Sequence, residues 1–294
     1  MGNVLAARPR SRELDSAAAA LAAAGVPDAK REALFLWATA SGESVAEVWR
    51  RPEAEPSAEV VERYRALVSR RGAGEPLAYV TGRVGFRTLE LVVDRRVLIP
   101  RPETEGLVER VLDWARTKFG GSQPEWGSAA DVGTGSGCVA LSLAQEGLFR
   151  SVVGTDISPE AMEVARANRD RVRPRVQVEF RLGDLCGPLV GERFQVIASN
   201  PPYVSEHEFS GLERSVRDFE PRSALVSGPD GMYHASRLIE EAGGFLEPGG
   251  LLALEVDSTR ASAALERAGA EGWREPRLER DVFGRPRYLL ASWR

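Results

Sequence analysis

The spacing of apolar residues changes along the chain and divides it into three predicted parts. In residues 1–74, apolar positions recur every three or four residues, as in amphipathic helices. In residues 75–100, apolar and polar positions alternate as they do in a β-strand. In 101–294, short apolar runs alternate with helical stretches after Ala129, which predicts strand–helix repeats joined by right-handed crossovers. We therefore expect an α/β fold in which a helical bundle and a linker precede a parallel sheet.

Residues 1–74 are expected to form four short helices. Ser44 and Glu47 have the spacing of a capping box at the start of one of them. Over 1–75 we count 11 basic and 11 acidic residues, so this part is not a polybasic arm. A bundle of this kind either docks a macromolecular substrate or only stabilises the chain, and its residues leave both functions open.

Residues 75–100 are expected to form a β-hairpin between the two larger parts. Apolar residues alternate over 89–93, Asp94-Arg95 is expected to turn the chain, and 97–99 supplies the second apolar run.

Three glycines at alternate positions mark the turn after the first predicted strand: Gly133, Gly135 and Gly137. Lacking side chains, they let a ligand approach the backbone closely, and the helix behind them offers free N–H groups. Asp156 ends the second predicted strand, 19 residues past Gly137, near the offset of roughly 20 residues expected for a ribose-binding carboxylate. Helix capping is the alternative for Asp156, but the glycine turn favours ribose binding.

An acid and an apolar residue follow the third predicted strand, near Val176–Phe180. Asp184 suits the exocyclic amino group of an adenine, and Leu185 suits the flat face of the same ring. A plain loop is the alternative for this pair.

The fourth predicted strand, Phe194–Ile197, leads into Asn200-Pro201-Pro202-Tyr203. Two prolines cannot continue a strand ladder, so the chain leaves the sheet at Asn200 with a stiff backbone. We expect the Asn200 side-chain oxygen and the Pro201 carbonyl to hold the two hydrogens of a planar amino group, with Tyr203 stacked on its face. Such a nitrogen is a poor nucleophile, and fixing its orientation helps it to react. A capped, proline-terminated loop is the less favoured alternative.

Composition excludes several classes of protein. The chain has 294 residues, 43% of them hydrophobic, and a net charge of −4, as in an ordinary soluble protein without an overall basic surface for nucleic acid. Neither Cys138 with Cys186 nor His207 with His234 forms a metal-binding spacing or an obvious triad, so no metal is expected. The alanine-rich run 16–24 is too short to span a bilayer. We expect a cytoplasmic protein without membrane contacts.

A glycine turn followed by a ribose acid also suits a dinucleotide. The turn lacks the G-x-G-x-x-G spacing that fits a pyrophosphate, and a dehydrogenase has no use for the asparagine-proline motif at 200–203. A cofactor with an adenosine and no phosphate fits better, so we expect S-adenosylmethionine.

These residues together resemble the release-factor glutamine methyltransferase family (PrmC/HemK), within the class I S-adenosylmethionine-dependent methyltransferases. The similarity runs from about Glu75 to Arg287. The proline-rich stretch Leu98–Glu105 is the most discriminating, because Asn-Pro-Pro-Tyr also occurs in adenine and guanine amino methyltransferases. The other matching stretches are 75–82, 133–137, 156–159, 199–203, 220–225, 228–231, Asp281 and Gly284-Arg285.

The resemblance implies a Rossmann-like seven-stranded methyltransferase sheet in 101–294, a hairpin linker in 75–100 and a substrate-docking helical domain in 1–74. It implies methylation of the glutamine in the Gly-Gly-Gln motif of peptide chain release factors, which are the expected partners. We further expect a monomer that does not contact nucleic acid directly. Carried onto this sequence, the cofactor-binding residues are Gly133, Thr134, Gly135, Ser136, Gly137, Asp156, Asp184, Leu185 and Asn200. The substrate-binding residues are Asn200, Pro201, Pro202 and Tyr203, of which Asn200, Pro201 and Tyr203 are catalytic.

The sequence departs from the family's pattern at a few positions. Gly85 precedes Phe86 where the family usually has an acid, and Asp257 and Arg260 stand where it often has glycine and glutamine. These departures bear on the shape of the pocket rim rather than on the reaction.

Two other functions compete with this one. A nucleic-acid amino methyltransferase would share the asparagine-proline motif and should bring a basic recognition surface. A cofactor-binding module without catalysis would not need the glycine turn and the asparagine-proline motif together.

Overall fold

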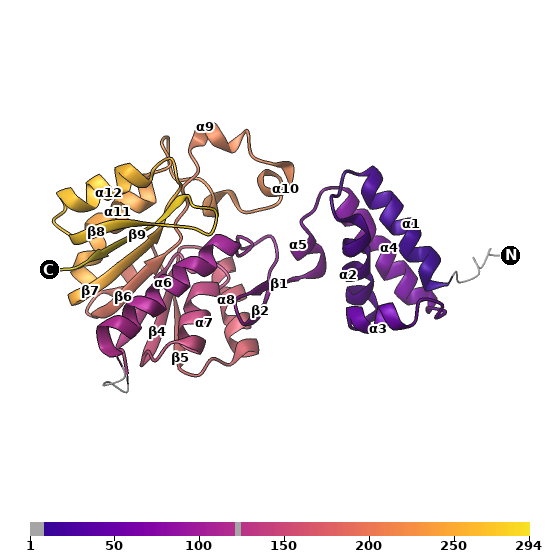
Figure 1. Ribbon diagram of the computed structural model, residues 1–294, viewed down its shortest axis with the longest axis horizontal. Helices are drawn as coiled ribbons and strands as arrows, with labels where there is room; N and C mark the ends of the chain where they lie inside the picture. Colours follow the sequence, from indigo (N-terminus) through magenta and orange to yellow (C-terminus); the bar gives the residue numbers. More distant parts are fainter. Residues whose placement is uncertain (1–8, 121–124) are drawn as a thin grey trace. The chain divides into compact units, whose positions relative to one another are not determined.

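The computed structural model describes residues 9–120 and 125–294 (Figure 1). The chain forms two compact units. The first comprises the residues up to Gly82 together with Arg214–Phe219, and the second comprises Arg83–Glu213 and Glu220–Arg294.

The first unit is a small helical bundle. Its core includes Leu21, Leu36, Trp37 and Tyr64, all at most 1% exposed, and the two aromatic rings meet edge to face at 4.7 Å. Ser44 and Glu47 form the predicted capping box. The helices are α1 (Arg10–Ala23), α2 (Ala29–Ser41), α3 (Val45–Arg50), α4 (Ala58–Gly72), α5 (Leu77–Thr81) and α10 (Arg214–Arg217). Because α5 packs on α2 and α4, this unit extends past the predicted boundary at residue 74.

The expected hairpin is formed, but its turn was predicted in the wrong place. Strand β1 (Arg83–Phe86) pairs antiparallel with β2 (Leu89–Val92), so the chain turns at Arg87 and not at Asp94-Arg95. Arg87 adopts a left-handed conformation, with φ of 51°. Distant acidic residues hold it there, because its backbone N–H and its guanidinium bond to Glu105 and Glu109 in α6 (Pro102–Phe119) and to Glu146 in α7 (Cys138–Glu146). Residues 97–99 form no strand.

The second unit is built on the predicted seven-stranded sheet, with strand order β5-β4-β3-β6-β7-β9-β8. The first five strands in this order are parallel, and β9 pairs antiparallel with both β7 and β8. Strand order reverses between β3 and β6, and ligands of open α/β sheets bind at the carboxyl ends of strands at such a switch point. The strands are β3 (Ser128–Val132), β4 (Ser151–Asp156), β5 (Gln177–Leu182), β6 (Phe194–Ser199), β7 (Leu246–Glu255), β8 (Arg274–Arg280) and β9 (Pro286–Ser292).

Helices cover both faces of this sheet (Figure 1). Successive residues of a strand point to opposite faces, so Ala129 and Val196 join one core cluster while Ala130 and Ile197 join the other. The first cluster lies under α6 (Pro102–Phe119), α7 (Cys138–Glu146) and α8 (Pro159–Val172), and the second under α11 (Tyr233–Glu241) and α12 (Ala261–Ala270). The remaining short helices are α9 (Glu206–Phe209), η2 (Gly187–Leu189), η3 (Arg222–Ala224) and η4 (Ala242–Phe245).

Strand β7 contains a sequence that is typical of a turn. Residues 247–250, Glu-Pro-Gly-Gly, lie within the strand, beside an irregularity in its pairing with β6. Backbone hydrogen bonds to Trp293, which directly follows β9, hold this part of the strand. The Gly249 N–H donates to the Trp293 carbonyl at 3.1 Å, and the Trp293 N–H donates to the Gly250 carbonyl at 2.8 Å.

Candidate active site

The glycine turn follows β3 at the carboxyl end of the sheet. Gly133, Gly135 and Gly137 have φ of 74°, 55° and 82°, a region that residues with a side chain rarely adopt. A methyl group on Gly133 or Gly135 would meet nothing within 4 Å, whereas one on Gly137 would lie 3.0 Å from the Phe180 ring. The first two glycines therefore leave room for a ligand, and the third permits close packing behind the turn.

A buried carboxylate, Asp131, holds this turn from below. Its Oδ2 accepts hydrogen bonds from the Thr134 hydroxyl at 2.5 Å and from the Ala140 N–H at 3.0 Å. The side chain is almost fully buried, and this burial raises the pKa of Asp131 to about 6 despite the two hydrogen bonds. Asp131 had no predicted role.

Asp156, at the end of β4, connects that strand to the turn. Its Oδ2 accepts from the Gly135 N–H at 2.8 Å, and its Oδ1 accepts from the Ser158 N–H at 2.9 Å, at the start of α8. Burial raises the pKa of this carboxyl. The carboxylate thus supports the entry to the helix, as the alternative interpretation held, and it also lines the same cavity as Gly133 and Gly135.

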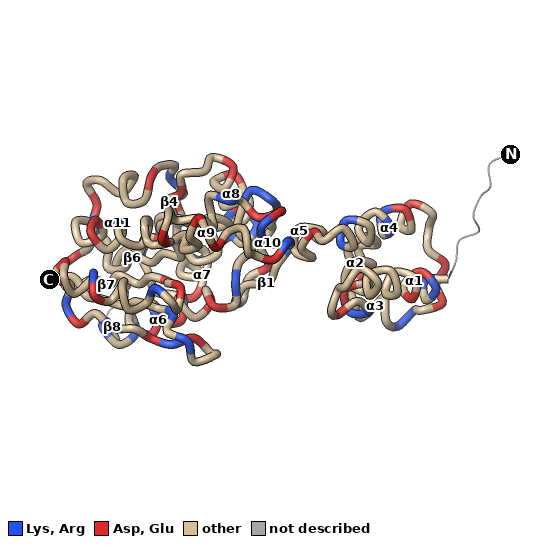
Figure 2. Tube along the Cα trace, turned by 90° about the horizontal axis from the view of Figure 1, so that it is seen from above, with Lys and Arg blue, Asp and Glu red and all other residues tan. Residues whose placement is uncertain are grey.

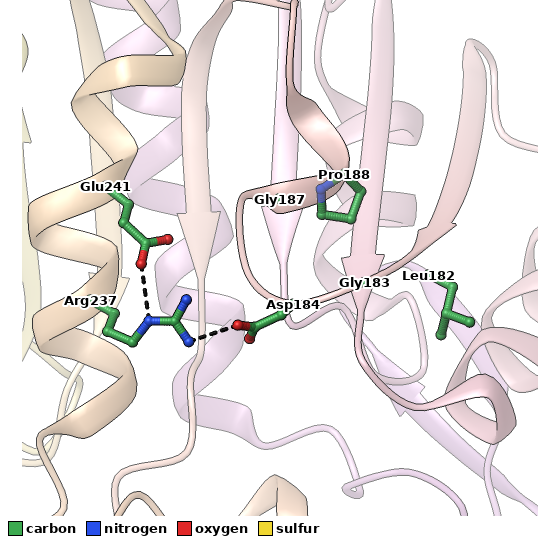
Figure 3. Close-up of a pocket in the computed structure, with 7 residues that line it drawn as sticks. All are labelled: Leu182, Gly183, Asp184, Gly187, Pro188, Arg237 and Glu241. Carbon is green, nitrogen blue, oxygen red and sulfur yellow. Dashed lines mark hydrogen bonds and ion pairs between the residues drawn. The ribbon is translucent and has the colours of Figure 1, made fainter.

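Asp184 and Leu185 border this cavity from the end of β5. Asp184 Oδ2 accepts from Arg237 Nη1 at 2.8 Å, and Arg237 Nε donates to Glu241 at 3.0 Å (Figure 3). The carboxylate therefore already has a guanidinium partner, so the predicted hydrogen bond to an adenine amino group would be made in addition to this ion pair. Leu185 has φ of 44°, and its carbonyl accepts from the Thr155 hydroxyl at 2.9 Å.

Asn200 leaves the sheet directly after β6, beside the glycine turn. The two strand ends are tied together because the Ser199 hydroxyl donates to the Val132 carbonyl at 2.6 Å. Asn200 lines the cavity that contains Asp156, and a second cavity that reaches the turn from the side of α6. The chain therefore places the asparagine and the glycine turn at one opening.

The predicted site residues do not all face these two cavities. The first cavity is lined by Gly133, Gly135, Asp156, Asp184, Leu185, Asn200 and Pro202, among others. The second is lined by Gly133, Thr134, Gly135, Ser136 and Asn200, among others. As the described residues delimit them, neither cavity is lined by Gly137, Pro201 or Tyr203. Burial raises the pKa of Tyr203 to about 12, so its hydroxyl stays neutral.

Two stretches that matched the family's motifs meet beside the site. Arg101 Nη2 donates to Glu220 Oε1 at 2.6 Å, and the Ile99 N–H donates to Glu220 Oε2 at 3.1 Å. Leu98 and Pro221, their neighbours in the chain, line the first cavity. The buried Glu220 thus fixes both stretches at the rim.

Three residues near the opening had no role assigned to them from the sequence. The Thr104 hydroxyl accepts from Asn200 Nδ2 at 2.9 Å and donates to Glu255 Oε2 at 2.8 Å. His234 lines the first cavity, and its Nδ1 lies 2.8 Å from the Ser227 hydroxyl; burial lowers its pKa. Thr104 lies in the proline-rich motif, which was the signal available for it. Glu255 and His234 carry no comparable local pattern.

Within the described residues, no three His, Cys, Asp or Glu side chains are grouped so that they could hold a metal ion. None of the described helices combines the length and the apolar character needed to cross a membrane.

Two family models match the chain. The PrmC N-terminal domain matches residues 14–82, and the methyltransferase small domain matches residues 122–216.

Solved structures with the same fold include a methyltransferase from Pyrococcus furiosus, with a TM-score of 0.51 and 21% identity over 78% of this chain and 96% of that chain. The hMettl16 catalytic domain in complex with MAT2A 3′UTR hairpin 6 superimposes with a TM-score of 0.53 and 13% identity, covering 77% of this chain and 81% of that chain. At these identities the likeness shows the fold alone.

Relatives of known family are more similar in sequence. The release factor glutamine methyltransferase of Koribacter versatilis is 38% identical over 94% of this chain and 96% of that protein. That of Moorella thermoacetica is 39% identical over 95% of this chain and 96% of that protein. The chain therefore belongs to the release factor glutamine methyltransferase family, and its methyl donor is S-adenosylmethionine.

Proposed function

We propose that this enzyme transfers the methyl group of S-adenosylmethionine to the side-chain amide nitrogen of the glutamine in the Gly-Gly-Gln motif of peptide chain release factors. The observation that carries the proposal is the position of Asn200, whose side chain borders the same cavity as the glycine turn and Asp156. An acceptor for an amide N–H and a site for the methyl donor thus share one opening.

The residues around the cavity fit S-adenosylmethionine. Gly133 and Gly135 leave open space where a methyl group would stand, so a ligand can approach the backbone closely there. Asp156 offers carboxylate oxygens for ribose hydroxyls, and Leu185 offers an apolar side chain for the adenine. Asp184 is proposed to lie beside the adenine while it remains paired with Arg237. When bound, the cofactor supplies an electrophilic methyl group on a positively charged sulfur.

The residues after β6 are proposed to orient the substrate glutamine. The Asn200 side-chain oxygen and the Pro201 carbonyl accept the two amide N–H bonds, and Pro202 keeps this corner stiff. The Tyr203 ring packs on the amide plane. Holding the nitrogen at near-attack distance lowers the entropic part of the barrier. The product nitrogen then releases its proton to water, so no dedicated base is needed.

The partner proposed for this site is a protein rather than a nucleic acid. In the helices of the first unit, positive and negative residues are interspersed (Figure 2), and Arg10, Arg65 and Arg71 pair with glutamates there. Nucleic-acid surfaces instead gather positive charge. We propose that this unit docks the release factor, and that the enzyme acts in the cytoplasm as a monomer.

The test is methylation of a purified release factor. The enzyme is incubated with radiolabelled S-adenosylmethionine and either a release factor or total RNA, and the labelled peptide is identified by mass spectrometry. We expect one methyl group on the glutamine of the Gly-Gly-Gln motif, formed about 100-fold or more slowly by the Asn200→Ala enzyme. Label in RNA, or on a different residue of the release factor, would overturn the proposal.

A further inference from the structure

Three side chains from distant parts of the second unit form a continuous chain of hydrogen bonds that ends at the catalytic motif. Glu255 is the last residue of β7, Thr104 lies in the first turn of α6, and Asn200 follows β6. Asn200 Nδ2 donates to Thr104 Oγ1 at 2.9 Å, and the Thr104 hydroxyl donates to Glu255 Oε2 at 2.8 Å. Glu255 and Thr104 are 1% and 2% exposed.

The chemistry of the carboxylate sets the direction of this chain. An ionised carboxylate only accepts hydrogen bonds, so the Thr104 hydroxyl must donate its single proton to Glu255. The hydroxyl oxygen is then left to accept, and only the NH2 end of the Asn200 amide can donate to it. This arrangement turns the Asn200 carbonyl oxygen away from Thr104.

We propose that Glu255 and Thr104 are positioning residues, which fix the Asn200 amide with its nitrogen toward Thr104 and its oxygen toward the amide of the substrate. The inference rests on the proposed function, because it assigns Asn200 as the acceptor for the substrate N–H. With the amide reversed, Asn200 would present its own NH2 to the NH2 of the substrate, and neither group could accept.

The surroundings of Glu255 indicate that its role is not to stabilise the fold. Its Oε1 is buried without a hydrogen-bond partner among the described residues, and burying an incompletely paired carboxylate costs free energy. The N-terminus of α6 partly compensates, since the dipole of a helix favours negative charge there. A polar chain with an unsatisfied member that leads to a catalytic amide fits a positioning role.

The ionisation of Glu255 gives this chain a dependence on pH. Burial raises the pKa of Glu255 to about 7, against the opposing effects of Thr104 and Arg287. Several titratable groups either influence the pKa of Glu255 electrostatically or have their own pKa influenced by it. They are Arg101 and Glu103 at the start of α6, Cys138 in α7, Tyr203 after β6, and Arg287 and Tyr288 in β9. Below pH 7 the protonated carboxyl can itself donate to Thr104, and the direction of the chain is no longer set.

Two sets of variants test this inference kinetically. Thr104→Val has nearly the same shape but no hydroxyl, whereas Thr104→Ser keeps the hydroxyl, and Glu255→Gln keeps the size but can donate. We expect Thr104→Val and Glu255→Gln to lower kcat about 10- to 100-fold, with the Kd for S-adenosylmethionine by calorimetry within about twofold. Thr104→Ser should retain most of the activity. The wild-type rate should fall below pH 7, and this acidic limb should be absent in Glu255→Gln.

Nuclear magnetic resonance tests the orientation without any turnover. Asn3, Asn168 and Asn200 are the three asparagines of the chain, so selective ¹⁵N-asparagine labelling gives three side-chain amide signals, and Asn200→Asp identifies one of them. In the wild type, this signal should shift with a midpoint near pH 7, and in Glu255→Gln it should not.

The outcomes separate this inference from the proposed function. A wild-type enzyme that leaves release factors unmethylated refutes the proposed function, while the pH response of the Asn200 signal still tests the hydrogen-bond chain. An active wild type whose kcat is unchanged in both Thr104→Val and Glu255→Gln refutes the positioning role. Folding of each variant is checked by near-ultraviolet circular dichroism, and the Thr104 pair gives an answer if Glu255→Gln does not fold.

Discussion

Asn168 hydrogen-bonds both polar backbone groups of Val92. The Val92 N–H donates to Asn168 Oδ1 at 2.7 Å, and Asn168 Nδ2 donates to the Val92 carbonyl at 2.9 Å. The same Nδ2 donates to the Ser136 carbonyl at 2.9 Å. One fully buried amide on α8 thus joins the hairpin strand β2 to the glycine turn, and it takes the place of a neighbouring strand for Val92.

Replacing Asn168 with alanine should destabilise the second unit. The substitution leaves three backbone groups without partners, the buried Ser136 carbonyl and the two partly buried groups of Val92, and each buried group left unpaired costs roughly 1–3 kcal/mol. We expect a loss of about 3 kcal/mol or more in the free energy of unfolding, measured by urea denaturation. Asp170→Ala, an exposed change on the same helix, should alter it by less than about 0.5 kcal/mol. Equal effects of the two changes would show that Asn168 does not hold the hairpin.

Features governed by neighbouring residues could be predicted from the sequence. The capping box of Ser44 with Glu47, the positive φ values of the glycine turn, and the exit of the chain at Asn200 all depend on residues next to one another. The alternation of apolar runs with helical stretches was sufficient for the parallel sheet, because each run had to be buried on both faces.

Features governed by distant contacts could not be predicted. The hairpin turns at Arg87 because Glu105, Glu109 and Glu146 hold this arginine, and none of them is near it in sequence. In the site, the hydrogen bond between Thr104 and Glu255 joins residues 151 positions apart. Its significance depends on burial, which no local pattern reveals.

Asp156 is expected to contribute to cofactor affinity. Asp156→Asn removes the negative charge and one of the two acceptor oxygens that hold the Gly135 and Ser158 N–H groups. We expect the Kd for S-adenosylmethionine to rise about tenfold or more, which corresponds to about 1.4 kcal/mol. Isothermal titration calorimetry measures this directly. Glu160→Gln removes an exposed charge at the start of the same helix and serves as the control. If both variants bind like the wild type, the ribose role of Asp156 is refuted.

Asn200→Ala should separate catalysis from cofactor binding. The variant loses the side-chain oxygen proposed to hold the substrate amide, while the glycine turn and Asp156 remain in place. We expect single-turnover methyl transfer to fall about 100-fold or more, or about 3 kcal/mol in the barrier, with little change in the Kd for S-adenosylmethionine. A parallel loss of cofactor affinity would mean that Asn200 serves the cofactor rather than the substrate amide.

Asp131 should make the folded state less stable as pH rises from about 4 to 6. Its folded-state pKa is raised from 3.8 to about 6 by burial, so between these values the folded protein holds a proton that the unfolded chain has lost. The free energy of unfolding then falls as pH rises through this window. Outside the window, the contribution of Asp131 changes little with pH. The full shift corresponds to about 3 kcal/mol, most of it lost between pH 4 and pH 7.

The Asp131→Asn variant isolates this contribution. Asparagine cannot ionise, and its oxygen can take the place of Oδ2, which accepts both hydrogen bonds from Thr134 and Ala140, but its NH2 group then stands where Asp131 has Oδ1. The variant is therefore compared with the wild type by the slope of unfolding free energy against pH, not by absolute stability. Glu255 and Asp156, whose pKa values are also raised, contribute to both proteins and cancel to first order in the difference. The wild type should lose more stability than the variant between pH 4 and pH 6 in urea titrations. Parallel slopes would show that Asp131 is already ionised in the folded state at pH 4, and that its bonds to the glycine turn outweigh its burial.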